Sequence, residues 1–269
     1  MEVLTLTETG LLLTSVDKFT MINTITISIL VVSAIGIVLV DGECQTNSGP
    51  IESCCCLGYN NTHFNAKSPG VYTIGNFGGV KCSNTRVYCD TTSGGGGWLV
   101  VQRRKDGSVD FNRDWIDYED GFGSLTGEFW FGLRGMHTLT NQGQWELRID
   151  YTFTNGTKGY LSYSNFRVGP ATEQYPLTIS GFDGVTTDPF STYAINGMKY
   201  TTRDRDHDNW GNNCAVHDAG GNSGGWWYRA CSDIFLNHQY NKGYTIYLNG
   251  QWHPLPFIEI KIRPKNYII

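Results

Sequence analysis

The sequence has few charged residues and no long block of basic ones. Charged side chains make up 17% of the 269 residues, and the formal net charge is −5. A nucleic-acid-binding surface needs clustered Lys and Arg, and the run Arg103-Arg104-Lys105 is too short to form one. We therefore expect no nucleic acid among the partners of this protein.

Motifs of catalysis and of zinc binding are also missing. No CxxC pair faces another, and Gly94–Gly97 lacks the Lys-Ser/Thr that follows in a phosphate-binding loop. Ser232, Asp233 and His238 are the residue types of a hydrolase triad, but no GxSxG elbow surrounds Ser232. These absences favour a binding protein over an enzyme.

The chain contains no internal repeat, no Gly-X-Y run and no heptad pattern, so no collagen or coiled-coil stem is expected. It has instead 33 glycines, 13% aromatic residues and 40% hydrophobic residues, which suit a fold with many turns and large aromatic anchors. The composition is uniform beyond a short polar linker at 41–53. We predict one domain over residues 54–264.

An uncharged stretch at 21–40 follows an N-terminal tail of residues 1–20. Its twenty residues are long enough to cross a bilayer as a helix, either as a signal anchor or as a cleaved signal peptide. Lys18 before it, and Asp41 and Glu43 after it, favour an N-in, C-out orientation. A buried core helix is the less favoured alternative, because such a helix normally carries a polar stripe.

Eight cysteines without zinc-ligand spacing indicate disulfides formed in an oxidising compartment. Two matches to the N-glycosylation pattern, at Asn60 and Asn155, agree weakly with this. Both readings of the segment at 21–40 deliver the rest of the chain outside the cell. We therefore expect a secreted or single-pass membrane-anchored extracellular protein.

Short alternating segments predict half-buried antiparallel strands. An Asn155-Gly156 turn between two of them indicates a hairpin. The predicted strands are Gly97–Arg104, Gln144–Phe153, Tyr160–Val168 and Phe257–Pro264, and short helices are expected within 111–123 and 127–140. After Asn165 the chain is dominated by loops, and loops of that length inside a domain are usually functional.

Residues 201–214 place three aspartates at alternate positions: Asp204, Asp206 and Asp208. Such a stretch is either a solvated turn or a cage for a hard cation, which prefers oxygen ligands. An EF-hand is excluded, because Asn209 and Ala215 occupy the positions that require Gly and Glu.

Four segments in a fixed order resemble the signature regions of the fibrinogen C-terminal-like domain, which is shared by fibrinogen, ficolins, tachylectins and angiopoietins. They are Gly94–Leu133, Asn196–Ala215, Gly224–Cys231 and Ile258–Pro264. The resemblance implies an α+β fold. This fold has a small N-terminal disulfide subdomain, a central antiparallel sheet with helices, and a loop-rich C-terminal subdomain for calcium and ligand.

The resemblance also assigns the aspartates to a calcium (Ca2+) site. Carboxylates of Asp206 and Asp208 and backbone carbonyls of Trp210 and Asn212 match the family's ligands. Asp204 falls outside this set.

Disulfides follow from the same resemblance. It pairs Cys214 with Cys231 and implies a cis peptide between Ala230 and Cys231. It also pairs Cys89 with one residue of the run Cys54-Cys55-Cys56. The resemblance assigns no partner to Cys44, Cys82 or the other two cysteines of the run. These could pair within the chain or link two chains.

In ficolin- and tachylectin-like members, a small cavity beside the calcium loop binds acetyl groups. Aromatic walls hold the methyl and a backbone N–H holds the carbonyl oxygen. The matching positions are Trp226, Tyr247 and Leu248 as walls, with Ala230, Cys231 and Ser232 around the donor. Core packing is the alternative for Trp226 and Trp227.

Two departures from the family pattern leave the ligand open: Ser232 stands where His is usual, and Asn222 where a wall tyrosine is usual. The expected function is calcium-dependent, lectin-like recognition of acetylated glycans, as in innate immunity. The alternative is a protein-binding module that engages a receptor or a peptide end, with Asp218 as a partner for a peptide amino terminus. A single acetyl site is weak, so a homo-oligomer is expected.

Overall fold

The computed structural model of the chain describes residues 2–7, 10–15, 68–74, 85–184, 188–191, 194–216, 224–240, 245–248 and 250–265. The chain divides into two units, Met1–Ser48 and Gly49–Ile269. In the first unit, β1 (Glu2–Thr7) and β2 (Gly10–Ser15) form an antiparallel hairpin, a feature that the prediction of a plain tail missed. The uncharged segment at 21–40 lies outside the described residues. No helix within the described ranges is long and apolar enough to cross a membrane.

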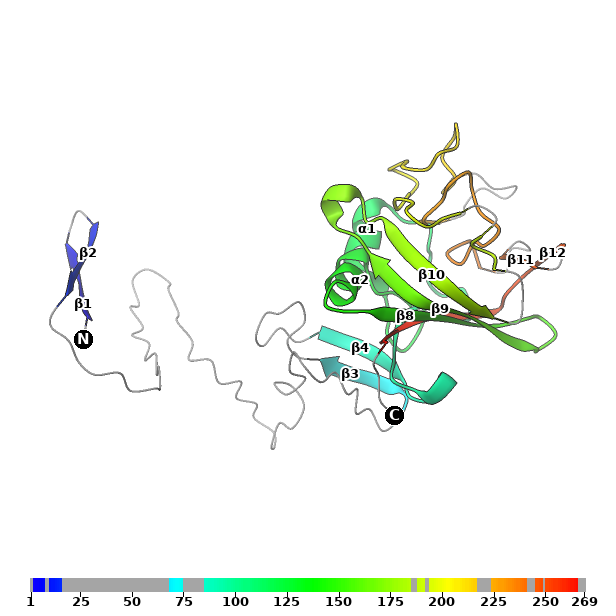
Figure 1. Ribbon diagram of the computed structural model, residues 1–269, viewed down its shortest axis with the longest axis horizontal. Helices are drawn as coiled ribbons and strands as arrows, with labels where there is room; N and C mark the ends of the chain where they lie inside the picture. Colours follow the sequence, from blue (N-terminus) through cyan, green and yellow to red (C-terminus); the bar gives the residue numbers. More distant parts are fainter. Residues whose placement is uncertain are drawn as a thin grey trace. The chain divides into compact units, whose positions relative to one another are not determined.

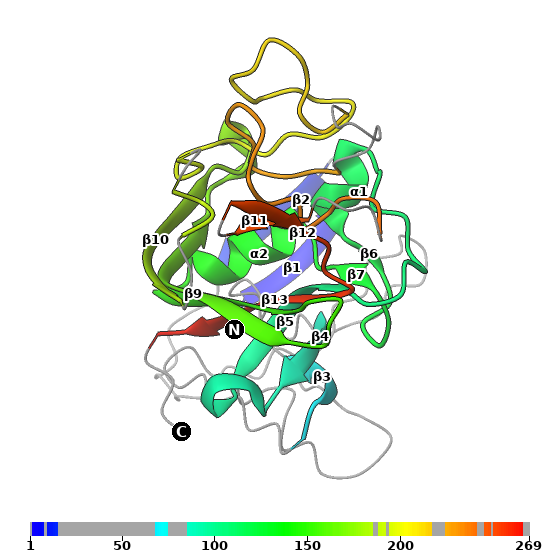
Figure 2. The same ribbon diagram turned by 90° about the vertical axis from the view of Figure 1, so that its right-hand side faces the viewer.

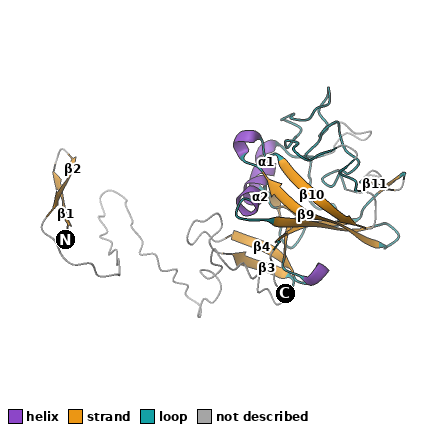
Figure 3. Ribbon diagram, in the orientation of Figure 1, coloured by secondary structure: helices purple, strands orange, loops and turns teal. Residues whose placement is uncertain are grey.

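The second unit is built on a nine-stranded sheet in which all pairs are antiparallel. Figures 1 and 3 show β3, β4, β8, β9 and β10 of this sheet. Its main path runs β10-β9-β8-β13-β5-β4-β3, while β7 pairs with β5 and β6. The strands are β3 (Gly70–Ile74), β4 (Thr85–Asp90), β5 (Trp98–Arg104), β6 (Phe122–Gly123), β7 (Phe129–Trp130), β8 (Trp145–Thr152), β9 (Lys158–Val168), β10 (Leu177–Gly184) and β13 (Phe257–Pro264). The predicted central antiparallel sheet and all four predicted strands are confirmed.

Short helices and a second small sheet complete the described part of this unit. The helices are α1 (Trp115–Asp120), α2 (Leu133–Thr140), η2 (Ser93–Gly95) and η3 (Ala171–Glu173), and the small sheet pairs β11 (Ile246–Leu248) with β12 (Gln251–His253). Both helices expected from the sequence are present, and α2 packs on β9. Figure 2 shows the loop-rich residues after β10 gathered at one end of the sheet.

β13 determines the character of the two faces of the sheet. Ile258, Ile260 and Ile262 are each at most 4% exposed and belong to the hydrophobic core on one face. The C-terminal loops also pack on this face, where Gln102 Nε2 of β5 donates to the carbonyl of Leu236 at 2.9 Å. The intervening residues of β13 are polar and lie on the opposite face.

A buried carboxylate stabilises the loop that follows β5. Glu128 is 0% exposed. Its Oε1 accepts N–H bonds from Lys105, Asp106 and Gly107 at 2.7, 3.0 and 2.9 Å, and its Oε2 accepts one from Val109 at 3.1 Å. Burial raises the pKa of Glu128, whereas the N–H groups of Asp106, Lys105 and Gly107 lower it. The lowering is the larger effect, so the net pKa lies below the ordinary value.

We expect Glu128→Gln to lower the free energy of unfolding by about 2–3 kcal/mol at neutral pH, because the amide nitrogen cannot accept a backbone N–H. A carboxyl whose pKa is depressed in the folded state stabilises above its unfolded pKa of about 4.3, and this contribution is lost as pH falls. The deficit of the variant should therefore shrink below about pH 4. Urea denaturation at several pH values measures it.

Glu173→Gln is the matched control, since Glu173 is exposed in η3. An equal loss in the two variants, or a deficit independent of pH, would contradict the role given to Glu128.

Candidate functional site

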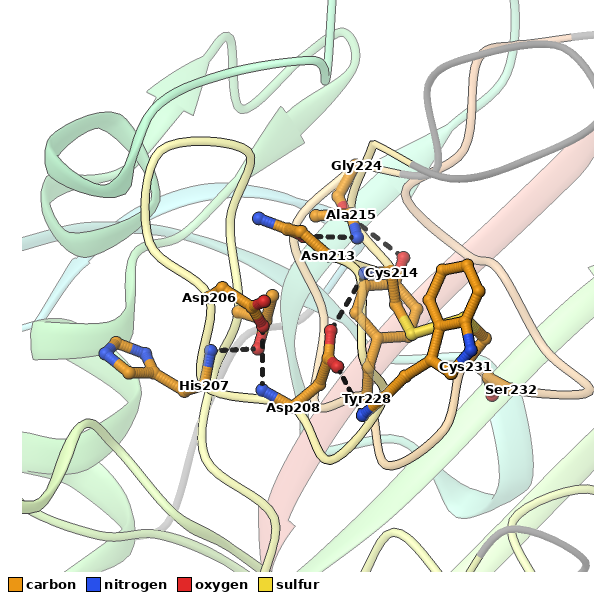
Figure 4. The surroundings of a disulfide bond; sticks show 12 residues. Asp206, His207, Asp208, Asn213, Cys214, Ala215, Gly224, Tyr228, Cys231 and Ser232 are labelled. Atoms are coloured by element: carbon orange, nitrogen blue, oxygen red, sulfur yellow. Dashed lines mark hydrogen bonds between the residues drawn. A yellow bond between two sulfur atoms is a disulfide. The ribbon is translucent and has the colours of Figure 1, made fainter.

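The predicted calcium loop brings two carboxylates together (Figure 4). Asp208 Oδ1 accepts the N–H of Trp210 at 2.9 Å, and its Oδ2 accepts the N–H of Cys214 at 2.8 Å. Asp206 Oδ1 accepts the N–H of Asp208 at 3.2 Å. The ring of His207 points away from both, toward Trp115 and the carbonyl of Tyr200.

The electrostatics of this pair suit a cation. Burial raises the pKa of Asp208, and the charge of Asp206 raises it further, whereas the N–H groups of Cys214 and Trp210 act in the opposite direction. The net effect is a raised pKa of Asp208. Two ionised carboxylates at this separation repel one another. A hard cation between them would remove this repulsion, and oxygen donors are what calcium prefers.

Two carboxylates alone do not complete a calcium shell. Among the described residues, no group of three or more His, Cys, Asp or Glu side chains could hold a metal ion. Further ligands would have to be backbone carbonyls and water, as the prediction for Trp210 and Asn212 supposes. Of the predicted calcium ligands, the structure brings the carboxylates of Asp206 and Asp208 together, and the site itself stays a prediction.

Asp204 has a different role, consistent with its place outside the predicted ligand set. Its Oδ1 accepts the N–H of Trp115, the first residue of α1, at 2.8 Å and the hydroxyl of Thr202 at 2.7 Å. Asp114, the residue before the helix, makes no side-chain cap bond. The cap of α1 thus comes from 89 residues away in the chain, which local helix signals could not indicate.

The disulfide between Cys214 and Cys231, predicted from the resemblance, is present, with their Cα atoms 5.1 Å apart. The N–H of Asn209 donates to the carbonyl of Arg229 at 2.6 Å, and Thr201 and Trp226 exchange two backbone bonds at 2.9 and 3.0 Å. The calcium loop and the segment up to Cys231 are therefore held as one piece.

The peptide bond between Ala230 and Cys231 is trans, so the predicted cis bond is wrong: the described residues contain none. Cys231 adopts a φ of +65° instead. A non-glycine residue in this left-handed region is strained by about 1–3 kcal/mol and persists where its surroundings enforce it. Here the disulfide and the loop contacts supply that enforcement.

Trp226, predicted as a pocket wall, packs in the core. It is 3% exposed and lies against Phe190 and Trp227, with ring centroids 6.2 and 5.2 Å away. Leu248 is also buried, whereas Tyr247 is 38% exposed. Core packing therefore accounts for both tryptophans, and Tyr247 is the predicted wall residue that reaches the surface.

Near Cys231 the structure adds two aromatic residues that the sequence reasoning missed. The N–H of Tyr247 donates to the carbonyl of Asp233 at 2.8 Å, which places β11 beside the cystine. The ring of Trp252, on β12, lies 5.4 Å from that of Tyr247 and 5.6 Å from that of Phe235. The pairing of β11 with β12 brings these rings together, and no strong local sequence pattern predicts that pairing.

The hydroxyl oxygen of Ser232, the residue in place of the usual His, accepts the N–H of Ile234 at 3.1 Å. Ser232 is 5% exposed, so it supports the turn after Cys231 rather than the surface. Ala230 beside it is exposed.

Several other predictions fall partly or wholly outside the described residues. Cys89, for which a disulfide to Cys54, Cys55 or Cys56 is predicted, is instead a free thiol; it is buried, and burial raises its pKa to about 12. Asn155 is exposed in the turn between β8 and β9, where its Oδ1 accepts the N–H of Thr157 at 2.9 Å. The positions not described are Cys44, Cys54, Cys55, Cys56, Asn60, Cys82, Asp218 and Asn222.

The antiparallel sheet with its disulfide-locked, loop-rich C-terminal region is the architecture of a recognition domain. Residues 58–265 match the family of fibrinogen beta and gamma chains, C-terminal globular domain. The chain belongs to this family.

Relatives agree with this assignment. The chain is 43% identical over 210 residues to human fibrinogen C domain-containing protein 1, covering 72% of this chain and 44% of that protein. It is 40% identical over 204 residues to bovine fibrinogen-like protein 1, covering 68% and 64%. The chain thus spans less than half the length of the first of these relatives.

Solved structures show the same fold. The fibrinogen-like globe domain of human ANGPTL2 is 35% identical, with a TM-score of 0.67 over 75% of this chain and 94% of that one. Lamprey fibrin D-dimer, complexed with the peptide ligand Gly-His-Arg-Pro-amide, is 30% identical, with a TM-score of 0.63 over 76% and 72%.

We expect Asp204→Ala to lower the free energy of unfolding by about 1 kcal/mol, the usual cost of losing a helix cap. The loss should be the same with calcium and with a chelator, because the carboxylate is committed to α1. Thermal unfolding in both buffers measures this. A loss seen only in calcium would place Asp204 among the metal ligands instead.

Proposed function

We propose that this recognition module binds acetylated glycans in a calcium-dependent manner, through the surface around Cys231. The observation that carries the proposal is the pair Asp206 and Asp208, which lie side by side in the loop; burial, and then the charge of Asp206, raises the pKa of Asp208. A structural calcium ion there would stabilise a loop that has little regular hydrogen bonding. The disulfide from Cys214 transmits that order to Cys231.

The chain's own residues would then present the ligand site. Tyr247 offers an exposed aromatic ring for the acetyl methyl, and the backbone N–H of Cys231 is the donor proposed for the carbonyl oxygen. Because Trp226 is buried, the apolar side of this site is assigned to Tyr247 with Trp252 behind it. The ligand surface is thus more open than a pocket walled by Trp226.

The disulfide and the family support an extracellular location for this domain. One weak acetyl site per chain needs several copies for useful avidity, so a homo-oligomer is part of the proposal. Proteins of this family are in general binding proteins rather than enzymes.

A second candidate ligand is a peptide or protein. It is favoured by the similarity to lamprey fibrin D-dimer, which was solved with a bound peptide. In this alternative the same calcium-ordered loops would dock on an extracellular protein.

Calcium binding is tested by thermal unfolding of the full chain. We expect calcium at about 100 times its Kd to stabilise the protein by about 2.7 kcal/mol, and Asp206→Ala to abolish this increment. Asp206 is the cleaner position, since it accepts one backbone N–H at 3.2 Å, whereas Asp208 accepts two at 2.9 and 2.8 Å and its removal would destabilise more without calcium. Asp183→Ala, an exposed aspartate on β10, is the control and should keep the increment. Absence of any calcium effect in the wild type would overturn the metal site.

Ligand binding is tested on acetylated resin. The wild type should bind in calcium and elute with free N-acetylglucosamine, and Tyr247→Ala should weaken retention at least about tenfold. Ile116→Ala, which alters an exposed apolar side chain on α1, should bind normally. Lack of retention together with capture of a peptide or protein would favour the second candidate.

A further inference from the structure

The face of the sheet opposite the hydrophobic core contains a buried network of charges. Lys261 on β13 is 1% exposed. Its Nζ lies 2.6 Å from Asp90 on β4, 2.8 Å from Asp150 on β8 and 2.9 Å from Glu259 on β13. The network draws on four strands that meet only in the folded sheet: β4, β8, β13 and β5. The contribution of β5 is Arg103, which pairs with Glu259.

The network is neutral overall. Arg103 pairs with Glu259 at 2.5 Å, and Arg148 pairs with Asp150 at 2.7 Å. Three cations therefore face three carboxylates. Asp90 is held further by the N–H and hydroxyl of Thr92, at 2.9 and 2.8 Å.

Stability alone is a weak reason for such a network. Buried ion pairs gain little net free energy, because desolvation offsets their attraction, and apolar side chains of similar size often do as well. β13 shows the apolar solution on its other face, with Ile258, Ile260 and Ile262. A bound ligand that contacts these polar groups would explain their presence better than stability does.

A cleft of about 570 Å³ lies over this network. The charged groups Asp90, Asp150, Glu259 and Lys261 line it, together with the rings of Tyr88 and Phe257 on the same face. Thr92, Ser93, Thr152 and Lys158 are further lining residues. Its volume falls within the range of about 300–1,000 Å³ that is typical of small-molecule sites.

The buried ion network leaves little charge for an ionic ligand, and the further charge in the described lining, the exposed ammonium of Lys158, is not part of that network. Each N–H of the Lys261 ammonium has a carboxylate partner, so the ammonium has no N–H left for an anion. The carboxylates are neutralised by Lys261, Arg103 and Arg148, so a cation gains little there. Oε1 of Glu259 accepts a hydrogen bond from Arg103 and Oε2 accepts one from Lys261, and a carboxylate oxygen can accept two.

We propose that this cleft is a second binding site and that it takes a neutral hexose. Fixed carboxylate oxygens suit hydroxyl donors, and the ring of Phe257, with the face of Tyr88 that Arg103 does not cover, suits the apolar face of a sugar. Among the described residues, the lining of the cleft shares no member with the calcium loop or with the surface around Cys231. The proposal therefore does not rest on the acetyl site and can fail separately from it.

Saturation-transfer NMR on the full chain with D-glucose, D-galactose and D-mannose tests this site. At least one hexose should receive saturation from the protein, equally in calcium and in a chelator. Thr152→Trp fills the cleft beside Asp150 and should weaken that binding at least about tenfold. Thr154→Trp is the matched control, because Thr154 is exposed in the hairpin turn and is not among the cleft residues.

Phe257→Ala provides a second variant in case Thr152→Trp misfolds, and it should weaken binding by removing the ring. Absence of saturation transfer to all three hexoses would overturn the proposal, as would equal binding in Thr152→Trp and Thr154→Trp. Loss of the signal in chelator would assign the sugar to the Cys231 surface and would likewise overturn it. Binding of inorganic phosphate in place of the hexoses, seen by line broadening, would contradict the neutral class of ligand.

Discussion

β13 lies between β5 and β8 in the middle of the sheet, although it comes last among the described strands. Its pairing with β5 joins residues such as Glu259 and Arg103, which are 156 positions apart. Because side chains alternate along a strand, β13 contributes isoleucines to the core face and charged residues to the other face. Both candidate sites depend on this placement: the C-terminal loops pack on the first face, and the ion network forms on the second.

The described residues between β10 and β11 form no long strand and no helix, so other interactions have to hold them. Asp208 accepts two backbone N–H groups, the disulfide joins Cys214 to Cys231, and Asp204 connects the loop to α1. The three aspartates at alternate positions thus perform separate tasks. Two are turned to one another, and the third is a helix cap.

Local patterns were sufficient for four of the nine strands of the sheet and for both α-helices. The alternation in Gln144–Phe153 and Phe257–Pro264 predicts β8 and β13 because a half-buried strand needs only its own sequence to show it. The disulfide between Cys214 and Cys231 followed from the family resemblance, not from spacing. Three features could not be derived in this way: the trans bond before Cys231, the burial of Trp226 and the capping role of Asp204.

The sequence by itself determined the antiparallel strands, the family and the grouping of Asp206 with Asp208, because these are encoded in residues that are neighbours along the chain. The tertiary structure alone decided which polar residues of β13 are buried. Alternation predicts that Lys261 faces away from the core, but its 1% exposure results from carboxylates on β4 and β8 that converge on it. Such convergence depends on strand order, and strand order is set by long-range pairing rather than by any local pattern.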